Sequence, residues 1–486
     1  MIGDSTLYFD VIVVGGGNAA MCAALSAREK GARVLLMEKA SPEERGGNCP
    51  YTGGGFRFTH NGAADLKPLL GDPSALEGLE DRISPYTAAV YRREMLEKTD
   101  GRTDPDLLKT LIDESYPTVL WMRGQGIEFE LSGRGARVMA GVRVGASAVG
   151  SGPGLIAMHY TAARRHGVEV VYETKMLRLL TDDVGRVTGV LAEDAEGVQK
   201  IRAGGVALAC GGFEANSEMR SEHLGGHWGR AKVRGSRHNT GDGHRAALKI
   251  GASIAGQWTG YHGTPIDADA PDTGSPDSVD RLPRRSYPFG VMLNVEGERF
   301  VDEGADFALN NFVEMGASIL KQPKGIAFQV FDAKVESLLE ERYGSASAVR
   351  AETIGELAEK LGLDSGAVER TIGEFNEAVQ EGEFDPSTLD GKGTRGLDPP
   401  KSNWALAIDA PPFSAYRVTG GITYTFGGLK INSQAQVLDN EGMPIPGLYA
   451  AGEIVGGFFY FDSLRASGLM HGAVFGRIAG ANAVTG

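Results

Sequence analysis

The stretch that most constrains the fold is DVIVVGGGNAAMCAAL, at residues 10–25. It starts with a run of β-branched side chains at residues 10–14, which is typical of a buried parallel strand. Residues 19–31 have the pattern of a helix and end in a glycine. Residues 32–40 predict a second strand. These segments indicate a βαβ unit whose first strand meets its helix at a run of glycines.

The glycines match the fingerprint of a dinucleotide site. Gly15, Gly17 and Ala20 fill the G-x-G-x-x-G/A positions, which allow a tight turn, a close pyrophosphate and close helix packing. The helix N-terminus directs free N–H groups and a positive dipole end at the phosphates. Glu38 follows the second strand, where a carboxylate can accept hydrogen bonds from ribose hydroxyls. We predict dinucleotide contacts from Gly15, Gly17, Asn18, Ala19, Ala20, Glu38 and Lys39.

The fingerprint leaves FAD and NAD open, and later segments bear on the choice. Residues 44–58 hold two glycine clusters around Asn48, which would let a loop lie along an isoalloxazine ring. Residues 447–457 read as another strand and glycine turn, with Glu453 in the turn. A helix rich in small residues is expected within 463–483, and its N-terminus could face a flavin carbonyl.

Composition excludes several classes of protein. The chain has 486 residues, enough for two domains, and 70 of them are glycine, scattered in clusters that suggest close contact between backbone and ligand. The net charge of −14, with no basic block, argues against nucleic-acid binding. No apolar stretch approaches 18 residues, so we do not expect an integral membrane protein.

Cysteine usage points to a reduced compartment. Cys22, Cys49 and Cys210 are odd in number and far apart, which disfavours a disulfide framework, a metal site, an iron–sulfur cluster and covalent haem. The first ten residues lack the features of a secretory signal. We therefore expect a cytoplasmic enzyme without a metal site.

Taken in order, the motifs resemble those of a known family. They are GGG at 15–17, RGGN and GGG within 45–55, ACGGF at 209–213, NTGDG at 239–243, ERFVDE at 298–303 and GLYAAGE at 447–453. Together they resemble the fumarate reductase and succinate dehydrogenase flavoprotein superfamily over nearly the whole chain. Within it, GERFVDEGADF, AFQVFD and SGLMHGAVFGRIAG look most similar to tricarballylate dehydrogenases.

The resemblance implies an α/β fold: a discontinuous, Rossmann-type (glutathione-reductase-like) FAD domain with an inserted α+β capping domain. We expect the FAD domain at 1–258 and 423–486 and the capping domain at 259–422, with closure of the cap excluding water. A β-meander is predicted at 168–197, a surface stretch at 264–284, two packed helices within 353–379 and a solvated loop at 381–395.

The resemblance also implies FAD as the cofactor. Respiratory members link FAD to a histidine near the second glycine cluster, and Asn48 stands in that neighbourhood here, so we expect non-covalent FAD. The further FAD contacts predicted are Gly46, Gly47, Asn48, Thr52, Gly53, Gly54, Met176, Ala209, Gly211, Gly212, Gly241, Asp242, Gly452, Glu453, Ser467, Gly468 and Leu469.

Substrate residues follow from the same pattern. In this family a hydride passes between flavin N5 and a carbon beside a carboxylate, while a cap residue exchanges the proton. His262 matches the His-x-Thr substrate position, and Arg465 falls where an arginine clamps a carboxylate. Tyr424 stands where fumarate reductases carry a histidine, and could exchange a proton if cations lower its pKa. Tyr287 and Tyr460 are weaker substrate candidates.

One family feature is absent. Fumarate reductases place a proton-donating arginine shortly after ERFVDE, but residues 302–312 contain no cation. Arg284 or Arg285 could occupy that site from the neighbouring segment, although a solvated arginine pair is the favoured expectation. Tricarballylate dehydrogenases have a Pro-Gly-Gly stretch where this chain has Arg465. Efficient fumarate reduction is therefore not expected.

We predict an FAD-dependent oxidoreductase acting on a CH–CH bond next to a carboxylate, with a tricarballylate- or succinate-like substrate. Tyr424, His262 and Arg465 are the expected catalytic residues. One alternative is a 3-ketosteroid-type dehydrogenase that desaturates a ring beside a ketone. Another is a flavoprotein subunit without independent turnover. No second nucleotide fingerprint is visible, so a separate electron carrier is expected.

Overall fold

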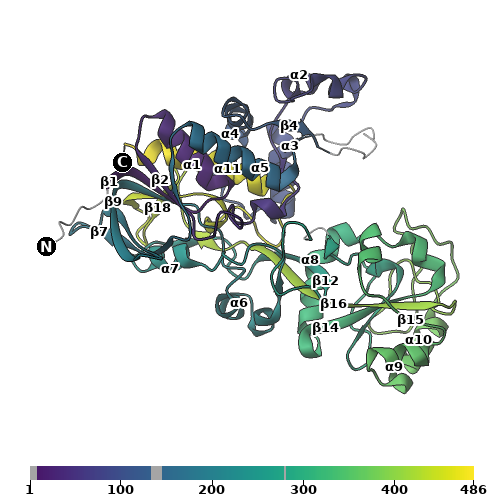
Figure 1. Cartoon of the computed structure of the whole chain (residues 1–486). Coiled ribbons are helices and arrows are strands. Elements are labelled where there is room, and N and C mark those ends of the chain that lie inside the picture. The colour runs from purple at the N-terminus through teal and green to yellow at the C-terminus, as the bar shows by residue number, and fades with distance from the viewer. Residues whose placement is uncertain (1–7, 133–144, 279–280, 486) are drawn as a thin grey trace. The chain divides into compact units, whose positions relative to one another are not determined.

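The computed structural model describes residues 8–132, 145–278 and 281–485 (Figure 1). The chain forms two compact units. The first consists of residues 1–219, 236–261 and 424–486, and the second of residues 220–235 and 262–423. The assignment of an FAD-binding and a capping role to parts of the chain stays a prediction.

The first unit is built on a sheet with parallel central strands. Strand β1 (Tyr8–Val14) lies between β2 (Val34–Met37) and β9 (Gly197–Leu208), parallel to both. Beyond them, β6 (Glu169–Val171) is parallel to β2, and β19 (Pro444–Ala450) is parallel to β9. All of β2 is buried, as expected of a parallel strand covered on both faces. The predicted α/β class is confirmed.

A β-meander extends from the long strand β9. It consists of β7 (Lys175–Thr181), β8 (Val187–Asp194) and the first half of β9, paired antiparallel. The prediction for residues 168–197 was wrong about its first strand, because β6 joins the parallel sheet instead. Three residues separate β6 from β7, and local alternation does not reveal which partner a strand chooses.

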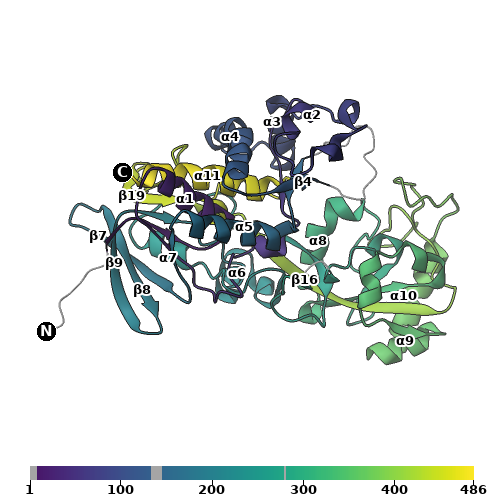
Figure 2. The same ribbon diagram turned by 45° about the horizontal axis from the view of Figure 1, so that its top comes forward.

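Two helices pack closely beside this sheet. Helix α1 (Asn18–Glu29) follows β1, and α11 (Ser467–Ala483) lies next to it in both ribbon views (Figures 1 and 2). A Cβ added at Gly476 would lie 2.3 Å from the Ala19 carbonyl oxygen, so only glycine allows this approach. The small residues of α11 thus allow this C-terminal helix to pack closely against the N-terminal βαβ unit.

The second unit has its own sheet and its own buried clusters. Its longest strand, β16 (Phe413–Thr425), pairs with β14 (Ile326–Phe331) and with β12 (Tyr261–Asp267). The two helices predicted within 353–379 are present, and their Leu357 and Val368 are buried. The predicted surface stretch 264–284 was partly wrong, because its first residues belong to β12 and are buried there.

The remaining elements are as follows. The first unit also has β3 (Gly55–Phe56), β4 (Phe129–Leu131), β5 (Ala146–Ala148), β11 (Ile254–Ala255), β17 (Gly428–Leu429), β18 (Gln436–Leu438), α2 (Ala63–Leu66), α3 (Ala88–Lys98), α4 (Pro105–Gly124), α5 (Ser151–Arg165) and α7 (Asp242–Leu248). The second also has β10 (Lys232–Val233), β13 (Val291–Asn294), β15 (Val349–Ala351), α8 (Ala308–Lys321), α9 (Ile354–Leu361) and α10 (Ser365–Ala378), and α6 (Ser217–His223) spans the boundary.

Candidate active site

The glycine turn after β1 leaves a helix N-terminus without a side-chain cap. Gly15 has a φ of +113°, and a Cβ there would lie 2.3 Å from the Ala209 carbonyl oxygen at the end of β9. Gly17 is the N-cap of α1 and has no side chain to cap the first turn, where the Asn18 N–H donates to the Cys49 thiol at 3.1 Å. Such an N-terminus is suited to phosphate oxygens. This geometry fits a pyrophosphate at the first glycine motif.

Beside this turn lies a buried carboxylate and an unsatisfied hydroxyl. Glu38 accepts hydrogen bonds from the backbone N–H groups of Ala40 (3.0 Å) and Gly46 (3.3 Å). The Tyr160 hydroxyl is buried and has no hydrogen-bond partner among the described residues. A Cβ added at Gly16 would lie 2.3 Å from both the Glu38 Oε2 and the Tyr160 Oη atoms. Two polar groups thus meet where Gly16 leaves no side chain, which fits a polar ligand.

The side chain of Asn18, in α1, forms hydrogen bonds with two other helices, α5 and α11. Its side-chain amide donates to the Leu469 carbonyl (2.8 Å), and its amide oxygen pairs with His159 Nε2 (3.0 Å). Burial lowers the pKa of His159 to about 3, so this imidazole is neutral. The first turns of α1 and α11 are therefore held together by a buried polar link.

The carboxyl groups of two acids from distant segments lie close together beside Gly212. A Cβ on Gly212 would lie 2.1 Å from Glu453 Oε1 and 2.7 Å from Glu214 Oε2. Asn48 and Asn239 donate to Glu214 Oε1 at 2.7 and 2.6 Å, and Asn48 also reaches Glu453 at 3.4 Å. Burial raises the pKa of both carboxyls, and the charge of Glu214 raises the pKa of Glu453 further. Such a pair holds one proton more readily than two separate carboxylates.

Lys39 and Asp242 form a second polar group. The Lys39 ammonium donates to Thr240 (2.7 Å) and Asp242 (2.8 Å), and Asp242 also accepts from Arg245 (2.6 Å). Burial alone would raise the pKa of Asp242, but the hydrogen bond and charge of Lys39 lower it to about 2. Asp242 is thus an anion whose partners are protein cations.

The other predicted FAD contacts lie in the first unit. Thr52 caps its own loop by donating to the Cys49 carbonyl (2.9 Å) and accepting from Gly54 N–H (3.2 Å). Ser467 is buried, and its hydroxyl accepts from Tyr91 (3.2 Å). The remaining ones are Gly47, Gly53, Met176 (buried on β7), Gly211, Gly241, Gly452 and Gly468. The uncapped helix end, the unsatisfied Tyr160 hydroxyl and the glycine cradle fit FAD.

Tyr424 contacts another hydroxyl. Its phenol forms a short hydrogen bond with Ser463, and its ring lies among Phe426 and Phe459. Burial raises the pKa of Tyr424 well above its usual value, and the carboxyls of Asp462 and Glu453 act in the same direction. The condition named for proton exchange, a pKa lowered by cations, is not met, because the neighbouring charges that act on this pKa are acidic. Tyr424 keeps its proton at neutral pH.

Arg465 lies two residues after Ser463 in the sequence. It is exposed, and its guanidinium has neither an acidic partner nor a hydrogen bond within the described part of the chain. Only its backbone carbonyl is used, as the acceptor of Arg57 Nε (2.7 Å). The next residue, Ala466, is the N-cap of α11 with a φ of +63° and provides no side-chain cap. A cation and an uncapped helix end are therefore adjacent.

The two weaker tyrosine candidates differ in their surroundings. Tyr460 is half-buried, and burial raises its pKa, with Asp104 adding to the effect. Tyr287, in the second unit, is fully buried and donates to the side chain of Asn311 (2.6 Å). Roles for both in substrate binding stay predictions.

His262 lies on β12 in the second unit, and its ring meets the Phe312 ring edge to face at 5.4 Å. Thr264, two residues on, faces the same side of the strand. The Thr264 hydroxyl accepts from Arg285 Nε at 3.1 Å. The His-x-Thr motif is thus connected to an arginine.

Arg284 and Arg285 are not a solvated pair. Arg284 is 2 % exposed and bonds Asp267 at 2.7 Å, whereas Arg285 is partly exposed and stacks over the Phe312 ring at 4.1 Å. The favoured expectation was wrong, because one arginine is bound to an acid and its neighbour lies over an aromatic face.

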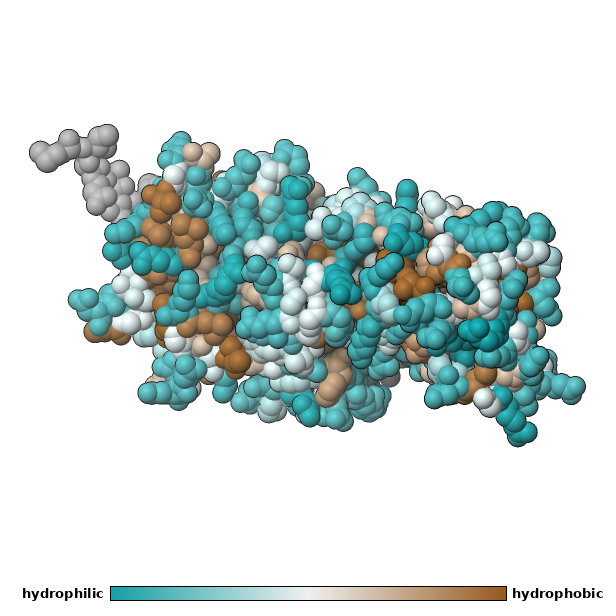
Figure 3. Space-filling model, turned by 90° about the horizontal axis from the view of Figure 1, so that it is seen from below, coloured by the Kyte–Doolittle hydropathy of each residue, from teal (hydrophilic) through white to brown (hydrophobic). Residues whose placement is uncertain are grey.

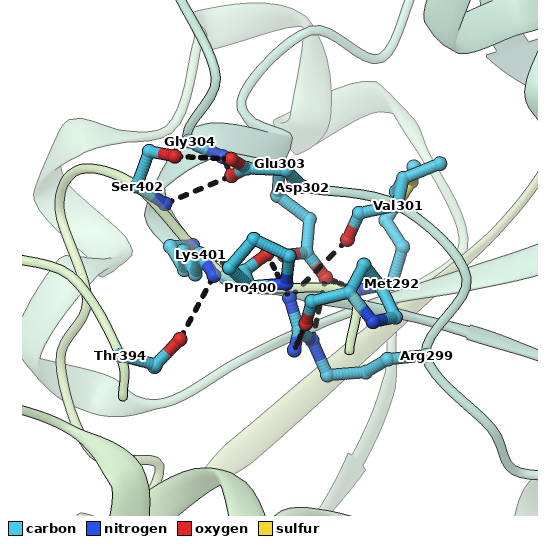
Figure 4. A network of polar contacts seen from close by, with 12 residues as sticks. Met292, Arg299, Val301, Asp302, Glu303, Gly304, Thr394, Pro400, Lys401 and Ser402 are labelled. Atoms are coloured by element: carbon cyan, nitrogen blue, oxygen red, sulfur yellow. Dashed lines mark hydrogen bonds and ion pairs between the residues drawn. The ribbon is translucent and has the colours of Figure 1, made fainter. Parts of the chain in front are cut away.

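The ERFVDE motif is a structural network (Figure 4). Arg299 and Glu303 form a buried ion pair with a shortest distance of 2.6 Å, and Glu303 also accepts from the Met292 N–H (2.7 Å). Asp302 accepts from Ser402, and the adjacent Lys401 is buried and donates to the Gly290 carbonyl. Burial lowers the pKa of Lys401 to about 8. The network holds the start of segment 302–312 in place, the segment in which the sequence has no cation.

Several residues of these groups were missed from the sequence. Glu214, Asn239, Tyr160 and Ser463 are far in sequence from the groups they meet. Glu214 lies beside the predicted Gly211 and Gly212, so a polar residue next to a glycine turn was a usable signal.

The parallel sheet, the glycine turn and the helix that starts directly after it define a dinucleotide-binding protein. Residues 10–469 match the family model described as FAD binding domain, and the chain belongs to this family. It is a member of the fumarate reductase and succinate dehydrogenase flavoprotein superfamily, with FAD as cofactor. The expected likeness to tricarballylate dehydrogenases stays a prediction.

Known relatives cover nearly the whole chain. Urocanate reductase of Eggerthella lenta is 30% identical, over 98% of this chain and 75% of that protein. "Probable fumarate reductase Ifc3" of Shewanella frigidimarina is 29% identical, over 97% and 74%. The open conformation of a flavocytochrome c3 fumarate reductase has a TM-score of 0.77 at 26% identity, over 99% and 79%. The chain is an FAD-dependent oxidoreductase acting on CH–CH bonds.

The surface gives no sign of a membrane-crossing helix. Over the described ranges, every helix is too short or too polar to span a bilayer. On the face shown in Figure 3, hydrophobic residues form small groups within a largely hydrophilic surface.

Proposed function

We propose that this enzyme reduces a carbon–carbon double bond conjugated to a carboxylate, and that Arg465 binds that carboxylate. The observation that carries the proposal is the exposed Arg465 guanidinium, which has no partner within the described ranges. A guanidinium offers two parallel donors that match the two oxygens of a carboxylate.

Cofactor binding belongs to the first unit in this proposal. The N-terminus of α1 would hold the pyrophosphate, and Glu38 would accept from a ribose. Bound FAD would supply the hydride to one carbon of the double bond. Ser467 and the uncapped first turn of α11 would face the flavin.

Tyr424 would supply the proton to the other carbon. Because burial and the neighbouring acids keep its pKa high, its hydroxyl is protonated at neutral pH. That state supports proton donation, which is reduction. Dehydrogenation of a succinate- or tricarballylate-like acid is the same reaction reversed and would need the phenolate. A separate electron carrier would reduce the enzyme.

Ring desaturation next to a ketone is the second candidate. Its support is the apolar surroundings of Tyr424, whose ring lies 5.7 Å from Phe426 and 6.3 Å from Phe459. The exposed cation at Arg465 favours the acid instead.

Single-turnover reoxidation tests the choice. Chemically reduced, FAD-loaded protein is mixed anaerobically with fumarate, crotonate, crotonamide or a Δ1-3-ketosteroid, and flavin absorbance is followed. We expect crotonate to react faster than crotonamide. Arg465→Gln should slow the reaction with crotonate by roughly 10- to 150-fold, the equivalent of about 1.5–3 kcal/mol for a charged hydrogen bond.

Arg92→Gln is the matched control, since Arg92 is an exposed arginine of α3. It should leave the rate unchanged. Equal rates for crotonate and crotonamide would refute carboxylate binding by Arg465. Reaction with the steroid alone would move the assignment to ring chemistry.

A further inference from the structure

We propose that the Tyr160 hydroxyl positions the Glu38 carboxylate, so that Glu38 recognises a single hydroxyl of the adenosine ribose of FAD. This rests on one part of the proposed function, in which Glu38 accepts a hydrogen bond from a ribose. All the residues that carry the inference belong to the first unit.

The Tyr160 hydroxyl is a buried polar group without a partner. Tyr160 lies on α5, which packs beside α1 (Figure 1), and the residue is 2 % exposed. Its hydroxyl forms no hydrogen bond within the described part of the chain. A hydroxyl removed from water without a replacement partner is unfavourable, so buried hydroxyls are nearly always hydrogen-bonded. The nucleotide-bound protein should therefore provide this hydroxyl with an acceptor.

The polar group beside this hydroxyl is the Glu38 carboxylate. A Cβ on Gly16 would lie 2.3 Å from both the Tyr160 Oη and the Glu38 Oε2 atoms, so the two oxygens border the same small space beside that glycine. Burial raises the pKa of Tyr160, and the charge of Glu38 raises it further. The phenol therefore keeps its proton and can donate it in a hydrogen bond to the carboxylate.

The Tyr160 ring is held by two neighbouring side chains. The Arg45 guanidinium lies over the ring, with its central carbon 4.7 Å from the ring centre. The Tyr172 ring is stacked with it at 6.0 Å, with 20° between the two planes. These contacts with the flat faces of the ring restrict its movement, so the hydroxyl stays next to Glu38.

The acceptor positions of Glu38 show why a single ribose hydroxyl is expected. A carboxylate offers about four positions, two on each oxygen. The backbone N–H of Ala40 donates to Oε1 at 3.0 Å, and that of Gly46 donates to Oε2 at 3.3 Å. A hydrogen bond from Tyr160 would fill Oε2 and leave one position, on Oε1. Without Tyr160, a position on each oxygen would be open to the two neighbouring hydroxyls of a ribose.

Fluorescence titration of the full-length apoprotein with FAD and two FAD analogues tests the inference. One analogue lacks the 2′-hydroxyl of its adenosine ribose, and the other lacks the 3′-hydroxyl. We expect Glu38→Gln to abolish the preference for FAD over one analogue only. In the wild type this preference should be roughly 10- to 150-fold, as for a hydrogen bond to a charged group. Tyr160→Phe keeps the ring and should bring the same preference to within about threefold, because the carboxylate is no longer fixed.

A double substitution separates positioning from direct contact. In the Glu38→Gln protein, adding Tyr160→Phe should change the dissociation constant of FAD by less than about twofold. A further loss of about tenfold there would mean that Tyr160 binds the ribose itself, and would overturn the inference. Tyr172→Phe is the matched control, since it removes the hydroxyl of the stacked neighbour and keeps its ring. It should retain the wild-type preference.

The outcomes distinguish the inference from the proposal on which it rests. An unchanged preference in Tyr160→Phe would overturn the inference while leaving ribose binding by Glu38 in place. Equal weakening of FAD and both analogues in Tyr160→Phe would show that the hydroxyl only supports the fold, and would also overturn it. An unchanged preference in Glu38→Gln would refute ribose binding by Glu38, and the inference with it.

Discussion

At the scale of single residues, the most informative group is the pair of carboxyls under Gly212. Glu214 is fully buried and receives hydrogen bonds from Asn48 and Asn239, but these amides are neutral. Two adjacent carboxyl groups must share a proton or repel each other. The charge of Glu453, a predicted FAD contact, therefore depends on pH through its pairing with Glu214.

This pair predicts a loss of stability as the pH rises. A carboxyl whose folded pKa is raised binds more protons when folded, so its stabilising contribution is full below the unfolded pKa of about 4.5 and declines as pH rises through the folded pKa. Glu214→Gln should remove the repulsion and flatten the fall in melting temperature of the apoprotein above that pH. Glu441→Gln, at an exposed site, should not. Parallel pH profiles for Glu214→Gln and wild type would contradict the shared proton.

Tyr424 yields a prediction about proton transfer. Tyr424→Phe removes the hydroxyl but keeps the ring, so FAD should still bind while reoxidation of reduced enzyme by an unsaturated acid slows by about 10²- to 10⁴-fold. Ser463→Ala should have a smaller effect. Tyr460→Phe is the comparison, and a larger loss there would assign the proton to Tyr460. Stopped-flow absorbance measures each rate.

At the scale of elements, the α1–α11 contact holds together the N-terminal turns of two helices. Predicting two glycine-rich segments from sequence was possible because local composition marks them. Their close packing depends on backbone atoms separated by most of the chain. Gly476 shows this, since a Cβ there would lie only 2.3 Å from the Ala19 carbonyl oxygen.

Substitution at this contact should therefore destabilise the first unit. Gly476→Ala places a methyl group against backbone, and we expect a loss of about 1–3 kcal/mol in the free energy of unfolding, with weaker FAD binding. Gly373→Ala in α10 is the control, since a Cβ there meets nothing within 4 Å. It should stabilise by about 0.5–1 kcal/mol. Denaturant unfolding measures both, and equal effects would refute the contact.

At the scale of the whole molecule, each unit has buried clusters of its own. FAD should then stabilise the first unit alone, by about 2.7 kcal/mol at a free concentration one hundred times its dissociation constant. Damage to the ERFVDE network should affect the second unit alone.

Glu303→Gln tests this independence. Breaking the buried pair leaves Arg299 without its anion, and we expect a loss of about 3–5 kcal/mol in the second unit. FAD affinity, measured by flavin fluorescence, should stay within about twofold of wild type. Glu377→Gln, at an exposed glutamate of α10, is the control. A large loss of FAD affinity in Glu303→Gln would show that the units are coupled.

The sequence by itself determined the βαβ unit, the dinucleotide fingerprint and the family. These depend on local patterns: a strand's burial, a turn that needs glycine, and a helix that starts directly after it. Tertiary structure alone decided which acid meets Glu453, which of two adjacent arginines is neutralised, and whether Tyr424 keeps its proton. These depend on the charges and burial that distant segments bring together, and no spacing along the chain encodes them.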